Sequence, residues 1–140
     1  MPRTLAAREP AEWDPRRSFP LIGRPLKVQP ILMVQVPTPR EEASWRSWGG
    51  VQTEAAVVEE IERIDHELKT LQGKAEFGLE ILPVERVGSV EDAENRADKD
   101  TDVVLVYACS GSGSMLRACL KGGRDRLVFV RLQSGPIYYW

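Results

Sequence analysis

The sequence predicts an α/β domain built on a parallel sheet with helices on both faces. Residues 103–108 and 127–130 are continuous apolar runs without alternation, as is typical of strands that are buried on both faces. Segments with strand character also alternate with segments of helical periodicity along the chain. A chain of 140 residues is long enough to form one such domain with a real core.

The elements follow in order. Residues 27–36 form the expected first strand, with Pro30 near its entry, because a proline inside a strand loses a ladder hydrogen bond. Thr53 can cap the next helix, whose apolar positions recur at the three-and-four spacing of a buried stripe. These positions are Val57, Ile61, Ile64, Leu68 and Leu71. Residues 77–87, with Pro83 near the end, supply the second strand.

The second half of the chain repeats this alternation. Ser89 and Asp92 resemble a capping box at the head of a short helix over 90–99. The strand over 103–108 leads into a helix that carries Met115, Leu116, Cys119 and Leu120 on one face and stops at Gly122 and Gly123. A last strand spans 126–132. We therefore expect a three-layer, Rossmann-like domain with four parallel strands in the flavodoxin-like order 2-1-3-4.

Composition narrows the class of partner. A net charge of -2 gives no electrostatic reason to expect a nucleic acid or an anionic membrane. No apolar run approaches the ~20 residues that span a bilayer. Cys109 and Cys119 have neither a metal-ligand spacing nor the density of a disulfide framework, which indicates free thiols in a reducing cytoplasm.

The two ends of the chain differ from its middle. Residues 1–25 are rich in proline and arginine, so we expect an extended arm that is mobile or lies across a partner, followed by the domain over 26–140. Arg16 and Arg17 suggest an export signal, but charged residues interrupt the apolar segment that should follow. The chain ends on four apolar or aromatic residues, Ile137, Tyr138, Tyr139 and Trp140. We expect either that a neighbouring subunit covers them or that the natural chain continues, and we favour the second.

The predicted strand order nominates a binding site by topology. It reverses between the first and third strands, so the loops over 40–50 and 110–114 flank one crevice. The first loop carries Arg40, Trp45, Arg46 and Trp48, which either contact a small ligand or anchor the loop to protein. The second consists of Ser110, Gly111, Ser112, Gly113 and Ser114, which either present backbone N–H groups to a ligand or form a plain tight turn.

Catalytic groups are scarce in this sequence. His66, the single histidine, falls on the solvated face of its helix, which argues against a Ser-His-Asp or Cys-His scheme. Adjacent acids such as Glu59 and Glu60 fit solvated helix faces. We therefore predict no catalytic residue and no metal site in this chain.

Three segments carry a resemblance to a known family. Residues 24–30, 44–54 and 129–140 resemble the N-terminal portion of sugar isomerases related to L-fucose and L-arabinose isomerases. The resemblance implies aldose-ketose interconversion through an enediol, with a divalent metal, usually manganese, held by later domains that this chain does not contain. It implies no cofactor bound by this chain itself.

In that family the first domain helps to build a homo-oligomer and closes a neighbouring subunit's sugar pocket. The resemblance therefore makes Arg40, Trp45, Arg46 and Trp48 candidates for sugar or interface contacts. The alternative is a self-standing flavodoxin-like module that binds a small ligand or has a regulatory role.

Overall fold

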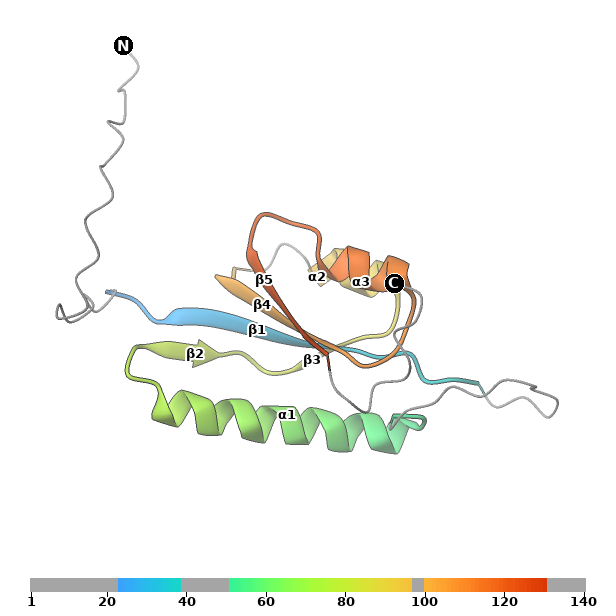
Figure 1. Cartoon of the computed structure of the whole chain (residues 1–140), viewed down its shortest axis with the longest axis horizontal. Coiled ribbons are helices and arrows are strands. Elements are labelled where there is room, and N and C mark those ends of the chain that lie inside the picture. The colour runs from blue at the N-terminus through green and yellow to red at the C-terminus, as the bar shows by residue number, and fades with distance from the viewer. Residues whose placement is uncertain (1–22, 39–50, 97–99, 131–140) are drawn as a thin grey trace, which may run out of the picture.

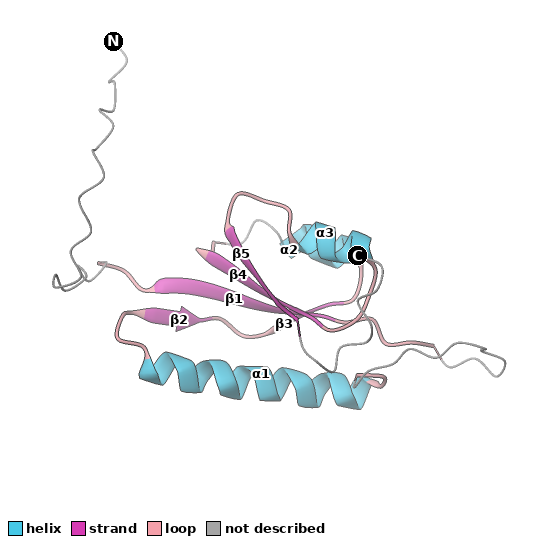
Figure 2. Ribbon diagram, viewed as in Figure 1, coloured by secondary structure: helices cyan, strands magenta, loops and turns pink. Residues whose placement is uncertain are grey.

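The sheet lies between α1 on one face and the shorter helices α2 and α3 on the other (Figure 1). The computed structural model describes residues 23–38, 51–96 and 100–130. In these residues the elements are β1 (Leu26–Met33), α1 (Glu54–Lys74), β2 (Leu79–Ile81), β3 (Glu85–Val87), α2 (Val90–Arg96), β4 (Val103–Ala108), α3 (Gly113–Cys119) and β5 (Asp125–Val130). The predicted α/β class is confirmed, as is the parallel sheet (Figure 2).

The strands follow the order β2-β1-β4-β5, and β3 pairs with the same edge of β1 as β2 does. This sheet differs from the predicted four strands in the order 2-1-3-4, because the segment expected to form one second strand forms two. The register explains the division. Val28 lies opposite Ile81 and Ile31 opposite Glu85, so residues 82–84 stand against only two residues of β1. The extra residue makes a bulge, which contains Pro83.

The position predicted for Pro30 is wrong, because it lies inside β1 and is fully buried. Val28 accepts a hydrogen bond from the Leu82 N–H, so alternate residues of β1 point their backbone groups toward β2 and β3. Pro30 therefore directs its missing N–H at the bulge, where regular pairing is interrupted in any case. The missing N–H of Pro30 is therefore compatible with the bulge, because no regular ladder hydrogen bond is required there.

The side chain of buried Gln29 supplies a hydrogen-bond donor at the bulge, where Pro30 has no backbone N–H. The Gln29 side-chain Nε2 donates to the Pro30 carbonyl at 3.0 Å and to the Pro83 carbonyl at 2.9 Å. Gln29 is only 4% exposed, so this amide is a structural part of the core.

Each face of the sheet has its own apolar cluster. Beneath α1, Leu32 of β1 and Val34, the residue that follows this strand, pack with Tyr107 of β4 and with the helix residues Val57, Ile64 and Leu68. On the opposite face, Ile31 and Met33 pack with Val106, and α2 and α3 contribute Ala93, Met115, Ala118 and Cys119. Alternation along β1 thus feeds both clusters from one strand.

The predicted helices are present, with differences at their ends. The Thr53 hydroxyl caps α1 by accepting from the Ala56 N–H at 3.1 Å, as expected. Leu71 is 56% exposed rather than buried, although it follows Ile64 by two turns on the same face, because the buried cluster beneath α1 ends at Leu68. Leu120 is likewise outside α3 and exposed. No described helix is both long and apolar enough to cross a membrane.

Asp102 fastens the amino ends of β1 and β4 together. Its carboxylate accepts from the Lys27 backbone N–H at 2.9 Å and from the Arg24 guanidinium at 2.6 and 3.1 Å. The Lys27 hydrogen bond, with Arg24 beside it, holds the pKa of Asp102 below its ordinary value. The ionised carboxylate is therefore favoured in the folded chain more than in the unfolded chain.

This arrangement predicts a dependence of stability on pH. The contribution of Asp102 is complete above its unfolded pKa of about 3.9 and is lost as the pH falls through the lower, folded value. In Asp102→Asn the melting temperature should drop at pH 7, and the difference from the parent should shrink as the pH falls through the folded pKa of Asp102. Thermal melts across pH 2–7 measure this, with Asp100→Asn, whose carboxylate is 94% exposed, as the control. A constant gap between Asp102→Asn and the parent would contradict it.

Candidate functional site

The candidate site is the edge of the sheet at which β1, β3 and β4 end. Because the strands are parallel, the loops that follow them lie on this carboxyl edge, and α1, α2 and α3 begin there. The position is the one at which open α/β sheets bind their ligands. Its chemistry depends on which side chains remain available.

Ser110 joins the loops that follow β1 and β4. Its hydroxyl accepts from the Gln35 N–H and donates to the Gln35 carbonyl, each at 3.0 Å. The backbone N–H groups of Cys109 and Ser110 both donate to the Met33 carbonyl. The Ser110 hydroxyl thus closes the top of the β1–β4 junction, and a ligand would have to share it with Gln35.

The rest of this loop has clear structural roles. Ser112 is the N-cap of α3, and its hydroxyl accepts from the Met115 N–H at 3.2 Å. Gly111 has a φ of +133°, a backbone conformation that side chains rarely adopt. Gly113 begins α3, and Ser114 is exposed. Ser112 is exposed too, but its hydroxyl is already engaged as the cap of α3.

Gly111→Ala should lower the free energy of unfolding by about 1–2 kcal/mol. The new Cβ would lie 2.9 Å from the Met115 Sδ, and the positive φ would strain any residue with a side chain. Denaturant unfolding measures the loss. Gly73→Ala is the control, because nothing lies within 4 Å of a Cβ built there. Equal stability of the Gly111 variant and the parent would contradict this account.

A charged pair connects the start of α1 to β3. The Arg86 guanidinium donates to both Glu54 carboxylate oxygens, with Nη2 3.0 Å from Oε1. The bond to Arg86 lowers the pKa of Glu54, and the bond to Glu54 raises the pKa of Arg86. Sequence reasoning did not pair Glu54 with Arg86, because 32 residues separate them. The carboxylate occupies the position in which α1 would hold an anion.

At the start of α2, side chains likewise bond nearby backbone N–H groups. The Ser89 hydroxyl accepts from the Asp92 N–H at 3.0 Å, and the Asp92 carboxylate accepts from the Gly88 N–H at 3.1 Å. The Gly88 bond is the main cause that lowers the pKa of Asp92. This confirms the predicted capping box.

The two cysteines are free thiols. Cys109 follows β4 directly at the carboxyl edge and packs against the cluster beneath α1. Burial raises the pKa of its thiol, so at neutral pH the group is protonated and a poor nucleophile. Cys119 is buried in α3, and burial raises its pKa too.

Arg40, Trp45, Arg46 and Trp48 lie outside the described residues, but both flanks of their segment are placed. Val36 precedes the segment and Val51 follows it, and both pack against the cluster beneath α1, together with Cys109. The segment therefore leaves and re-enters the domain at the carboxyl edge. That edge is where the topology predicted a site.

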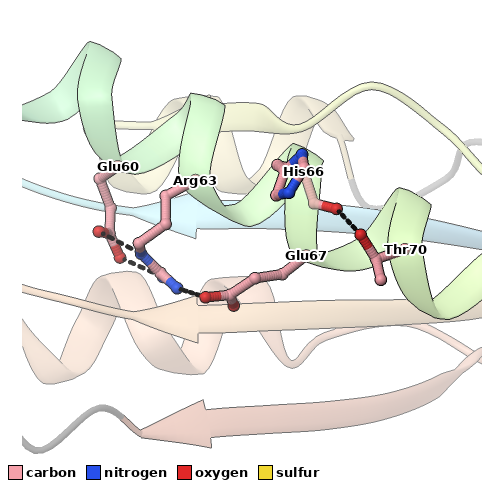
Figure 3. A network of polar contacts seen from close by, with 5 residues as sticks. All are labelled: Glu60, Arg63, His66, Glu67 and Thr70. Carbon is pink, nitrogen blue, oxygen red and sulfur yellow. Dashed lines mark hydrogen bonds and ion pairs between the residues drawn. The ribbon is translucent and has the colours of Figure 1, made fainter.

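His66 lies on the exposed face of α1, as predicted. Figure 3 shows its carbonyl accepting from the Thr70 hydroxyl, while Arg63 on the same helix bonds Glu60 and Glu67. No described group of three or more His, Cys, Asp or Glu side chains could hold a metal ion.

Comparison with known proteins adds no relative: no family model, no curated protein and no solved structure matches this chain.

Proposed function

We propose that this chain is the Rossmann-like N-terminal domain of a cytoplasmic sugar isomerase-like protein. It contributes to assembly of a homo-oligomer and to the sugar pocket, and it does not catalyse isomerisation alone. The resemblance of three segments to L-fucose and L-arabinose isomerases motivates the proposal.

One structural observation carries it. Segment 44–54 ends at Thr53 and Glu54, which start α1, and segment 129–140 begins at Phe129 and Val130, the last residues of β5. Both positions belong to the carboxyl edge, because Val130 lies opposite Ala108 and Ala108 lies opposite Met33. Two segments that are 75 residues apart at their nearest ends thus adjoin the edge at which a pocket would form.

The side chains of the first segment suit a sugar. Tryptophan rings pack on the apolar faces of pyranoses, and arginine donates to hydroxyl oxygens in a fixed fork. The isomerase reaction itself needs a divalent metal and acids from other domains, so no proton transfer is assigned to this chain. Its part would be to close and orient the pocket of the remaining chain or of a neighbouring subunit.

A self-standing binding module is the second candidate. The Ser110 hydroxyl ties the two loops at the switch between β1 and β4, which is where flavodoxin-like domains bind small anions or nucleotides. Such a module would bind its ligand with no other domain present.

The double variant Trp45→Ala, Trp48→Ala tests the first proposal. We expect it to weaken sugar binding roughly tenfold, or to dissociate the oligomer, because stacking area and interface area are both lost. Titration calorimetry of the longer natural chain that the proposal implies, with pentoses, hexoses, phosphate and nucleotides, measures affinity, and light scattering measures the mass. Trp13→Ala, in the N-terminal arm, is the matched control. Unchanged sugar affinity together with unchanged mass would contradict the proposal, and binding of a nucleotide but no sugar would favour the module.

A further inference from the structure

Strand β5 leaves one edge of the sheet open. It pairs with β4 from Asp125 to Val130, and no other described strand pairs with it. The Cys109 N–H bonds Met33 of β1, so the odd-numbered residues of β4 face β1 and the even-numbered ones face β5. The register then directs the backbone groups of Arg126, Val128 and Val130 away from the sheet.

The two edges of the sheet are not alike. At the far edge, β2 and β3 are three residues each, are separated by the bulge, and carry Glu80, Glu85 and Arg86. Interruptions and charges of this kind protect an edge from further pairing. In contrast, β5 is unbroken, and its last four side chains are apolar and 42–60% exposed. It has the features of a pairing edge.

Arg126 carries a hydrogen-bonding capacity that the described chain leaves unused. Its Nε and Nη2 atoms are shielded from water and have no hydrogen-bond partner. Together they form the side of the guanidinium that binds one carboxylate through two parallel bonds. Arg126 lies opposite Val104, on the same face of β5 as Val128 and Val130. A shielded, unbonded guanidinium is unfavourable, so the side chain gains by turning to an acid.

We propose that the outer edge of β5 binds an extended segment of another polypeptide, which presents a carboxylate to Arg126 and apolar side chains to Val128 and Val130. The segment would add a strand through backbone hydrogen bonds, and the acid would set its register. A second copy of β5 fits this edge less well. Val128 and Val130 share the face of Arg126, whereas Asp125, the acid within β5, points to the other face.

Peptide binding tests this inference without any sugar, so its failure is distinguishable from failure of the proposed function. The probe is acetylated and amidated Val-Thr-Glu-Thr-Val-Thr-Val, compared with the same peptide containing Gln in place of Glu. We expect the 140-residue chain to bind the Glu peptide about tenfold more tightly, because a bidentate charged pair becomes a neutral contact in the Gln peptide. Fluorescence anisotropy of labelled peptides measures both affinities.

Three variants assign the binding to this edge. Arg126→Gln should abolish the preference for Glu, and Arg126→Lys should reduce it, because lysine keeps the charge but loses the fork. Val128→Pro should prevent binding of both peptides, because it removes an outward N–H that β4 does not use. The exposed Arg117→Gln is the matched control and should bind as the parent does. Circular dichroism checks that each variant is folded.

Several results would overturn the inference. These are failure of the Glu peptide to bind, equal affinity for the two peptides, or unchanged binding by a folded Val128→Pro variant. A dimer of the parent that Val128→Pro converts to a monomer would also overturn it, because the occupant would then be a second copy.

Discussion

Replacing Leu32 by alanine should lower the free energy of unfolding by about 2–5 kcal/mol. Leu32 is 0% exposed and lies in the central strand, where it packs with Val57, Ile64 and Tyr107. Alanine would remove the apolar contacts and leave a cavity between β1 and α1. Rigid neighbours on a strand and a helix can collapse into it only in part.

Leu127→Ala is the matched control for this prediction. The substitution is chemically identical, but Leu127 of β5 is 60% exposed, so the expected loss is under about 0.5 kcal/mol. Urea unfolding followed by circular dichroism measures both variants. Similar losses for the two leucines would mean that β5 is covered in the folded chain, and would count against the open edge as well.

The contrast between these leucines shows where sequence reasoning about the strands ends. Residues 103–106 and 127–130 have the same continuous apolar pattern, and both form strands as predicted. Val104 and Val106 are buried between the sheet and helices α2 and α3, whereas Val128 and Phe129 are half exposed. Apolar character predicts that a segment is extended and prefers burial. It does not predict whether other parts of the same chain pack over that segment.

Local features of the candidate site were predictable, and long-range ones were not. The Thr53 cap and the pairing of Ser89 with Asp92 depend on residues three apart, and both are present. The Ser110 bonds to Gln35 join residues 75 apart, and nothing in the sequence marks either as a partner. The predicted topology could not show that the Ser110 hydroxyl bonds the Gln35 backbone.

A general rule about prolines in strands led to a wrong prediction for Pro30 in β1. The rule holds that a proline inside a strand breaks the ladder, and the expectation that Pro30 lies at the entry followed from it. The fold instead keeps Pro30 inside and breaks the neighbouring strand at the same level, with residues 82–84 bulged. Because the compensation comes from a segment more than 50 residues away and from the adjacent Gln29, the local pattern could not reveal it.

Gln29→Leu should therefore lower the free energy of unfolding by about 1–3 kcal/mol, although leucine is apolar and similar in size. The variant loses the amide that donates to the Pro30 and Pro83 carbonyls, and no water reaches a side chain that is 4% exposed. Chemical denaturation measures the loss, and hydrogen exchange at the Leu82 N–H, which bonds Val28 beside the bulge, should accelerate.

Gln35→Leu provides the comparison, because it makes the same substitution at an exposed residue whose backbone, rather than its side chain, bonds Ser110. It should change stability by less than about 0.5 kcal/mol. If Gln29→Leu is as stable as Gln35→Leu, the two carbonyls need no donor. The bulge alone would then accommodate Pro30, and the buried amide would contribute packing only. If Gln29→Leu is destabilised and its exchange is faster only beside the bulge, the break between β2 and β3 depends on a single side chain of the neighbouring strand.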